Sequence, residues 1–255
     1  MVKCFNTFWI AGTPRVGSML TFNLTREVLM TKQLTVRPDR ALKDGNECLQ
    51  IYQNEALHDD RQHVIYVFKV HQTLKPSIPR SKFIINKRNP FDICASFYEF
   101  MKCDLDRAIE VAQSHILTIE HYKTFDENTV MFVEYEEIEN NVSLVIQNIA
   151  DFLEQEINNV MVEEIGKKYS KEAVHKIISE LHKKHSKDIG AETLHPEEIV
   201  NLGGDKYRMF DTQTGFQTGH ISNRNSGEWT KVFNEEQISL IERKITPFAQ
   251  ELGYC

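Results

Sequence analysis

Short apolar runs alternate with longer amphipathic stretches through the first 153 residues of the chain. Continuous apolar strands separated by helices are typical of a parallel sheet that is covered on both faces. The pattern therefore predicts an α/β fold with three layers, a central parallel sheet flanked by helices. The predicted strands are Phe5–Ala11, Val64–Val70, Lys82–Lys87 and Thr129–Val133. The predicted helices are Ser18–Met30, Pro90–Lys102, Leu105–Tyr122 and Ile138–Leu153.

The last hundred residues have a different pattern. Val160 to Lys187 is helical and rich in lysine, and most of its charges are expected on solvated helix faces. Ala191 to Ser226 has weak periodicity and many Gly, Thr, Asn and Asp residues, which predicts long loops. Glu235 to Leu252 is an amphipathic closing helix. Because no linker or repeat separates two halves, residues 1–255 are expected to form one domain.

The charge and the cysteines narrow the function classes. Thirty Lys and Arg residues against 37 Asp and Glu residues give a net charge of -7, which argues against a broad nucleic-acid surface. No apolar run reaches the roughly 18 residues of a membrane span, and none fits a signal peptide. The five cysteines are scattered without a CxxC pair, so free thiols in a reducing cytoplasm are expected, and neither a disulfide frame nor a metal site.

The first strand leads into a turn from Gly12 to Gly17, and a helix follows at once. A turn of this kind points several backbone N–H groups at one place, where the helix dipole also favours an anion. The spacing of the two glycines fits the first part of a P-loop, but Ser18-Met19 replaces the Lys-Ser/Thr that an ATPase needs. Arg15 lies within the turn and can bind an oxyanion through two hydrogen bonds.

Two further strands end in polar residues. Lys69 and His71 lie at the end of the second strand, two residues apart and therefore on one side of it. Ligands of parallel sheets bind outside these carboxyl ends, where a histidine can act as a general base. A lone histidine there more often bonds only a neighbouring loop. Arg88 follows the next strand, and Asn89 with Pro90 is a good helix start, so Arg88, Asn89 and Ser96 are expected to converge on one phosphate.

Several of these segments resemble the motifs of the sulfotransferase superfamily. Thr13-Pro14-Arg15-Val16-Gly17-Ser18 is similar to the loop that binds the 5'-phosphosulfate, with Val16 where a small polar residue is usual. Lys69-Val70-His71 resembles the Lys-x-His that carries the catalytic base. The segment from Arg88 to Tyr98 resembles the 3'-phosphate motif Arg-x-Pro-x-Asp-x-x-x-Ser-x-Tyr, although its aromatic pair is displaced by one residue.

Weaker similarity follows towards the C-terminus. Glu134-Tyr135-Glu136 resembles a segment whose tyrosine helps to seat adenine, although a tyrosine that merely covers a strand end fits as well. Gly227-Glu228-Trp229 begins a Gly-Asp/Glu-Trp-x-x-x-Phe motif that ends at Phe233. Residues 222–226 stand where the family commonly has an Arg-Lys-Gly loop on the 3'-phosphate, and His220-Ile221-Ser222 is similar to a segment of bacterial members.

The resemblance implies a P-loop-like fold and transfer of a sulfuryl group from 3'-phosphoadenosine-5'-phosphosulfate (PAPS) to a small-molecule acceptor. It implies that His71 is the base, that Arg15 neutralises the leaving oxygen and that Lys69 supports the acceptor or the sulfuryl oxygens. No metal is required by this scheme. The resemblance implies that the nucleotide is bound by Arg15, Val16, Gly17, Ser18, Met19, Arg88, Ser96, Tyr135, Asn223, Arg224, Asn225 and Gly227.

Two other functions stay open at this point. A nucleotide kinase with a degenerate phosphate loop would need magnesium-dependent ATP turnover, and a non-catalytic protein would bind the nucleotide without transfer. The acceptor is not identified, and neither nucleic acid nor a membrane is an expected partner. Acidic residues in 31–62 and 186–219 suggest a polar or cationic acceptor such as a saxitoxin-type alkaloid, but solvated loops explain them too. The sequence leaves the oligomeric state open, a homodimer included.

Overall fold

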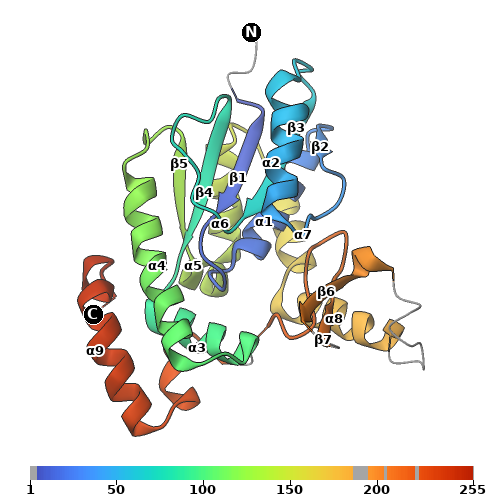
Figure 1. Ribbon diagram of the computed structural model, residues 1–255. Coiled ribbons are helices and arrows are strands. Elements are labelled where there is room, and N and C mark those ends of the chain that lie inside the picture. The colour runs from blue at the N-terminus through green and yellow to red at the C-terminus, as the bar shows by residue number, and fades with distance from the viewer. Residues whose placement is uncertain (1–4, 186–194, 204–205, 222–223, 255) are drawn as a thin grey trace.

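Five parallel strands form the main sheet of the computed structural model, which describes residues 5–185, 195–203, 206–221 and 224–254. Their order across the sheet is β2-β3-β1-β4-β5, so the first strand lies in the centre (Figure 1). All neighbouring pairs are parallel. The strands are β1 (Thr7–Ala11), β2 (Thr35–Arg37), β3 (Val64–Val70), β4 (Ser81–Lys87) and β5 (Val130–Glu134).

Helices cover both faces of this sheet, which confirms the predicted three-layer α/β fold (Figure 1). Ile10 and Val67 pack towards one helical layer, and their strand neighbours Trp9 and Phe68 pack towards the other, because side chains alternate along a strand. The first layer holds α1 (Ser18–Met30), α6 (Val142–Phe152), α7 (Asn159–Lys168) and α8 (Lys171–His185). The second holds α2 (Gly45–Asn54) and α4 (Leu105–Lys123), and α3 (Pro90–Met101) packs with α4 and α9 (Glu235–Glu251).

The structure corrects the predicted elements in two regions. The helix expected over residues 138–153 is two helices, α5 (Tyr135–Asn140) and α6, because the Asn141 side chain accepts a hydrogen bond from the Leu144 backbone and so starts a new helix. The stretch expected to be only loops contains an antiparallel hairpin of β6 (Ile199–Gly203) and β7 (Lys206–Met209). Strand β2 and helix α2 were not predicted, because residues 31–62 show little periodicity.

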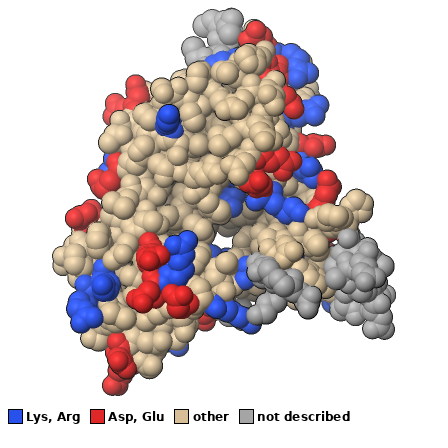
Figure 2. Space-filling view, in the orientation of Figure 1, with Lys and Arg blue, Asp and Glu red and all other residues tan. Residues whose placement is uncertain are grey.

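The carboxyl ends of the central strands meet at one edge of the sheet. The loops that follow β1, β3 and β4 leave from this edge and carry Arg15, His71 and Arg88, and Tyr135 begins α5 directly after β5. In the orientation of Figure 1, the space-filling view is hollowed between α3 and the β6–β7 hairpin, with Lys and Arg side chains along the hollow (Figure 2). The fold therefore brings the predicted site residues to one side of the molecule.

The described part of the chain contains no helix with the length and apolarity that a membrane span needs. Within the same residues, no three His, Cys, Asp or Glu side chains converge as metal ligands would. Cys48, Cys94 and Cys103 are free thiols.

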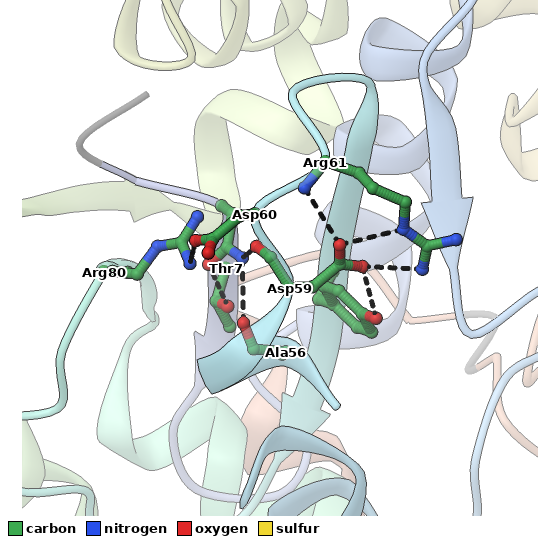
Figure 3. Close-up of polar contacts among 8 residues, drawn as sticks. Thr7, Ala56, Asp59, Asp60, Arg61 and Arg80 are labelled. Carbon is green, nitrogen blue, oxygen red and sulfur yellow. Dashed lines mark hydrogen bonds and ion pairs between the residues drawn. The ribbon is translucent and has the colours of Figure 1, made fainter. Parts of the chain in front are cut away.

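At the amino ends of β1 and β3, opposite the site, the buried carboxylate of Asp59 holds neighbouring segments together. Its two oxygens accept hydrogen bonds from the Arg61 backbone and guanidinium at 2.8–3.0 Å and from the Tyr66 hydroxyl at 2.9 Å (Figure 3). These bonds, led by those from Arg61, hold the pKa of Asp59 well below its usual range. Asn6, which enters β1, donates to the Asp59 carbonyl at 3.1 Å. The network ties the start of β1 to β3.

We expect Asp59→Ala to lower the free energy of unfolding by about 1–3 kcal/mol at neutral pH, because Tyr66 and Arg61 lose a charged acceptor. Since the folded pKa lies below the unfolded one, this contribution is present above about pH 4 and is lost as the pH falls further. Asp60→Ala is the matched control, because Asp60 is 88% exposed in its ion pair with Arg80 and should contribute about 0–1 kcal/mol. Urea unfolding at pH 7 and pH 3 measures both. Equal losses for the two variants would contradict the assignment.

Candidate active site

The phosphate loop runs from Gly12 to Gly17 between β1 and α1. Gly17 is the N-cap of α1 with φ 85°, and among the described residues no side chain caps this helix. The Leu20 N–H donates to the Gly17 carbonyl at 2.9 Å, which leaves those of Ser18 and Met19 for a ligand, as at other anion-binding helix starts. Arg15 also has a positive φ of 71°, a conformation that costs a non-glycine residue energy and is often found at functional sites.

Gly17 is required by its neighbours as well as by its backbone. A Cβ at this position would lie 2.7 Å from the Tyr135 ring. We expect Gly17→Ala to lower the free energy of unfolding by about 2–4 kcal/mol, the sum of left-handed strain and overpacking. Gly219→Ala is the control, since Gly219 has a similar φ of 78° but open space around it, and it should cost only about 1–2 kcal/mol. Urea unfolding separates the two; equal losses would mean that contact with Tyr135 is unimportant.

Arg15 points from the loop into the centre of the site. Its Nε donates to the Ser96 hydroxyl at 3.0 Å, and its NH2 group donates to the His220 carbonyl at 2.9 Å. Its guanidinium lies over the Phe100 ring, 4.1 Å from the ring centre. Burial, followed by the repulsion of Arg88, lowers the pKa of Arg15 to about 9, so it is still a cation at neutral pH.

Arg88 lies directly beside the loop. Its NH1 group donates to the Arg15 carbonyl at 2.6 Å, and its guanidinium covers the Tyr135 ring at 3.9 Å. Its Nε is buried and finds no hydrogen-bond partner among the described residues. No carboxylate forms an ion pair with Arg15 or Arg88 within that part of the chain. Two neighbouring cations without a counter-charge indicate a site for an anionic ligand.

Lys69 and His71 face each other at the end of β3, as their spacing predicted. Lys69 Nζ lies 2.6 Å from His71 Nε2, and His71 Nδ1 lies 2.9 Å from the Gly12 carbonyl. A carbonyl can only accept, so Nδ1 carries the proton and Nε2 has the lone pair, which accepts from Lys69. The His71 side chain is partly exposed, but loss of water to the surrounding loops, then the charge of Lys69, lowers its pKa to about 3. Burial lowers the pKa of Lys69 to about 8.

The other predicted residues line the same edge, and each has a defined environment. Val16 is fully buried against Phe91 and Ile93, which explains an apolar residue within the loop. Ser18 and Met19 are buried in the first turn of α1. Asn89 caps α3 through its side-chain oxygen, which accepts from the Phe91 backbone, and its convergence with Arg88 and Ser96 on a phosphate stays a prediction.

The C-terminal segment reaches the site through α3. Arg224 donates to the Glu99 carboxylate at 2.6 Å, and the Gly227 N–H donates to the buried Asp92 at 2.7 Å. The backbone N–H of Asn225 donates to Glu228, at 3.2 Å. Asn223 lies outside the described residues. Asn225 and Gly227 therefore sit beside the helix that starts after Arg88.

Sequence reasoning missed several residues that shape the site. Phe100 carries Arg15 on its ring, and the Arg208 guanidinium, from β7, lies 3.5 Å from the centre of the same ring. The His220 ring also stacks on Phe100 at 5.4 Å. His115 contacts Thr13 of the loop from the middle of α4. The chain gave no signal for Phe100 or His115, because both lie inside helices whose pattern indicates only core packing.

Comparison of the sequence with models of known protein families shows which family the chain belongs to. The sequence model of the sulfotransferase domain matches residues 6–252. The chain belongs to the sulfotransferase family. The match spans the Lys69–His71 pair and both segments that are predicted to bind phosphate, and it agrees with the resemblance that those motifs showed. A search of curated proteins found no significant match.

Solved structures show the same sulfotransferase fold. The mouse sulfotransferase SULT7A1 complexed with PAP has a TM-score of 0.61 and 16% identity, covering 96% of this chain and 83% of that chain. Retinol dehydratase in complex with androsterone and the inactive cofactor PAP has a TM-score of 0.59 and 14% identity, covering 95% of this chain and 80% of that chain. At these identities the likeness supports the fold.

Proposed function

We propose that this protein transfers a sulfuryl group from PAPS to a hydroxyl group of a small-molecule acceptor. The observation that carries the proposal is the joined pair of cations, Arg15 and Arg88, beside the Lys69–His71 pair at one sheet edge. PAPS has a phosphosulfate at one end and a 3'-phosphate at the other, so it needs two neighbouring cationic sites. The buried Nε of Arg88 and the uncapped start of α1 fit such a ligand.

In this proposal the chain binds the donor from two sides. Arg15, Ser18, Met19 and the loop amides would hold the phosphosulfate end, since their N–H groups and the helix dipole favour an anion. Arg88 and Ser96, with the segment 223–227, would hold the 3'-phosphate. The Tyr135 ring, which already stacks under Arg88, would seat the adenine.

When bound, PAPS supplies a sulfuryl group on a phosphate leaving group, and such transfers are served mainly by positioning and fixed positive charge. His71 Nε2 accepts the proton of the acceptor hydroxyl, because Gly12 holds the opposite ring nitrogen in its protonated form. Lys69 donates to Nε2 at 2.6 Å in this structure, so it must turn away before His71 can act. Arg15 offsets the negative charge that develops on the leaving oxygen.

The residues around Lys69 indicate which chemical class of acceptor could bind there. The gap beside Lys69 is closed in this structure and has no room for a water molecule. Its apolar walls lie on α1, on α2, on β3 and on the loop that follows β2, and they are formed by Met19, Phe22, Pro38, Ala41, Leu42, Cys48, Val67 and Phe68. Several of the acidic residues that suggest a cationic acceptor have structural partners, since Asp59 pairs with Arg61 at the far edge and Asp44 caps α2. Because these walls are apolar, we favour an alcohol or phenol with an apolar body, which would have to open the gap, over a saxitoxin-type alkaloid.

A transfer assay tests the proposal. Donor labelled in its sulfuryl group is incubated with phenols, aliphatic alcohols, amines and a guanidinium-bearing alcohol, and labelled products are separated. We expect transfer to a phenol or an apolar alcohol without added metal. Magnesium-dependent ATP turnover in place of transfer would favour a kinase, and binding of PAP without transfer to any acceptor would favour a non-catalytic protein.

A further inference from the structure

A histidine is buried between the two anion sites. His115 lies in the middle of α4 and has no exposed surface. Its Nδ1 lies 2.8 Å from the Thr13 hydroxyl of the phosphate loop. Its Nε2 lies 3.3 Å from the backbone nitrogen of Arg88, which starts the other site. One rigid ring therefore spans the gap between the segments that follow β1 and β4.

The hydrogen bonds fix the form of this ring. The backbone N–H of Arg88 can only donate, so Nε2 accepts and the proton of the neutral ring is on Nδ1. Nδ1 then donates to the Thr13 hydroxyl. Burial, followed by the charges of Lys87 and Arg88, lowers the pKa of His115 to about 3, so the ring is neutral between pH 5 and pH 8.

The two contacts close a ring of interactions around the site. Arg88 NH1 donates to the Arg15 carbonyl at 2.6 Å, which joins Arg88 to the loop directly. The fully buried His115 joins them a second time, through Thr13 and the Arg88 backbone. Thr13 is 5% exposed, and packing restricts its movement. A shift of either anion site would break one of the bonds to the imidazole and leave a buried polar group without a partner.

We propose that His115 is a positioning residue that sets the spacing between the phosphosulfate site and the 3'-phosphate site. This inference rests on the proposed function, because it requires one ligand to bind both sites at once. The histidine touches neither end of the donor. It acts on the 3'-phosphate through the Arg88 backbone and on the phosphosulfate through Thr13.

Two amide variants separate the two bonds. His115→Asn places an amide near Nδ1, so it retains the Thr13 contact and loses that to Arg88. His115→Gln places an amide near Nε2, so it does the reverse. We expect His115→Asn to weaken PAP about tenfold while changing the affinity of adenosine 5'-phosphate, which lacks the 3'-phosphate, by less than about threefold. We expect His115→Gln to retain PAP affinity and to lower kcat about tenfold.

His121→Gln is the matched control, because His121 lies on the same helix but bonds the Leu74 carbonyl away from the site. It should change neither the ratio of the two nucleotide affinities nor kcat. Thr13→Val removes the loop bond from the other side, so combining it with His115→Gln should lower kcat no further than either change alone. Thr13→Val also keeps the test usable if a His115 variant does not fold.

Calorimetry with PAP and adenosine 5'-phosphate, steady-state kinetics and nitrogen NMR of the His115 ring provide the measurements. An Nδ1-protonated ring from pH 5 to pH 8 supports the inference, and an Nε2-protonated ring overturns it. Equal losses for both nucleotides in His115→Asn, with no change in kcat for His115→Gln, also overturn it. If the unaltered protein fails to bind PAP, the proposed function itself is wrong.

Discussion

His71→Ala is expected to lower the rate of sulfuryl transfer by about 10²–10⁴-fold while PAP binds with nearly unchanged affinity. General-base catalysis is typically worth this factor. The geometry supports the role, since Nδ1 is held by the Gly12 carbonyl and the basic Nε2 faces Lys69 at the end of β3. Because alanine cannot accept the proton, the loss should appear in kcat and leave donor binding to Arg15 and Arg88.

The pH dependence of the turnover rate tests the same role of His71. A base acts in its neutral form, and the pKa of His71 is lowered to about 3 by burial and by Lys69. Once Lys69 has turned away from Nε2, the lowering caused by the surrounding loops remains, so the rate should fall less between pH 7 and pH 5 than it would for a histidine of ordinary pKa. His63→Ala, a change of an exposed histidine before β3, is the control and should leave turnover unaltered. Normal turnover of His71→Ala would remove this residue from the role.

Arg15→Leu is expected to lower kcat by about 10²–10³-fold, the usual effect of removing a fixed charge that stabilises a transition state. Arg15→Lys should recover only part of this loss, because a lysine cannot donate to Ser96 and to the His220 carbonyl through one planar group. PAP affinity should fall less than kcat in both variants, since Arg88 still holds the other end.

Arg107→Leu is the control for Arg15, because Arg107 is 60% exposed in an i,i+3 pair with Glu110 on α4. Single-turnover kinetics with saturating donor separates the transfer step from binding. An Arg15→Leu variant with unchanged kcat and weakened donor affinity would show that Arg15 only binds the nucleotide.

Much of this site could be predicted from the sequence because parallel strands end at one edge. Once Val64–Val70 and Lys82–Lys87 were identified as buried strands, Lys69, His71 and Arg88 had to lie near the phosphate loop. The structure places Lys69 and His71 on one side of β3, in contact, and it places Ser96 against Arg15, a pairing of residues 81 positions apart. The nucleotide roles of these residues stay predictions.

The remaining features depend on tertiary packing that a sequence pattern does not encode. The sequence pattern around Phe100 and His115 is that of ordinary helix residues. In the structure, the Arg15 guanidinium lies over the Phe100 ring, and His115 forms a hydrogen bond with Thr13. The β6–β7 hairpin was missed because its strands are only five and four residues long and lie in a stretch rich in Gly, Thr, Asn and Asp, and Arg208 within it reaches Phe100. The break at Asn141 follows from a side-chain cap, a local choice that the apolar periodicity of α6 hides.

The central claim is that one adenosine nucleotide is bound at both of its charged ends. The most direct test is calorimetric titration of PAP and of adenosine 5'-phosphate into the unaltered protein and into Arg88→Ala. The account predicts one PAP per chain, weaker binding without the 3'-phosphate, and loss of most of that difference in Arg88→Ala, about tenfold or more. Equal affinities of the two nucleotides for the unaltered protein, or equal losses in Arg88→Ala, would contradict it.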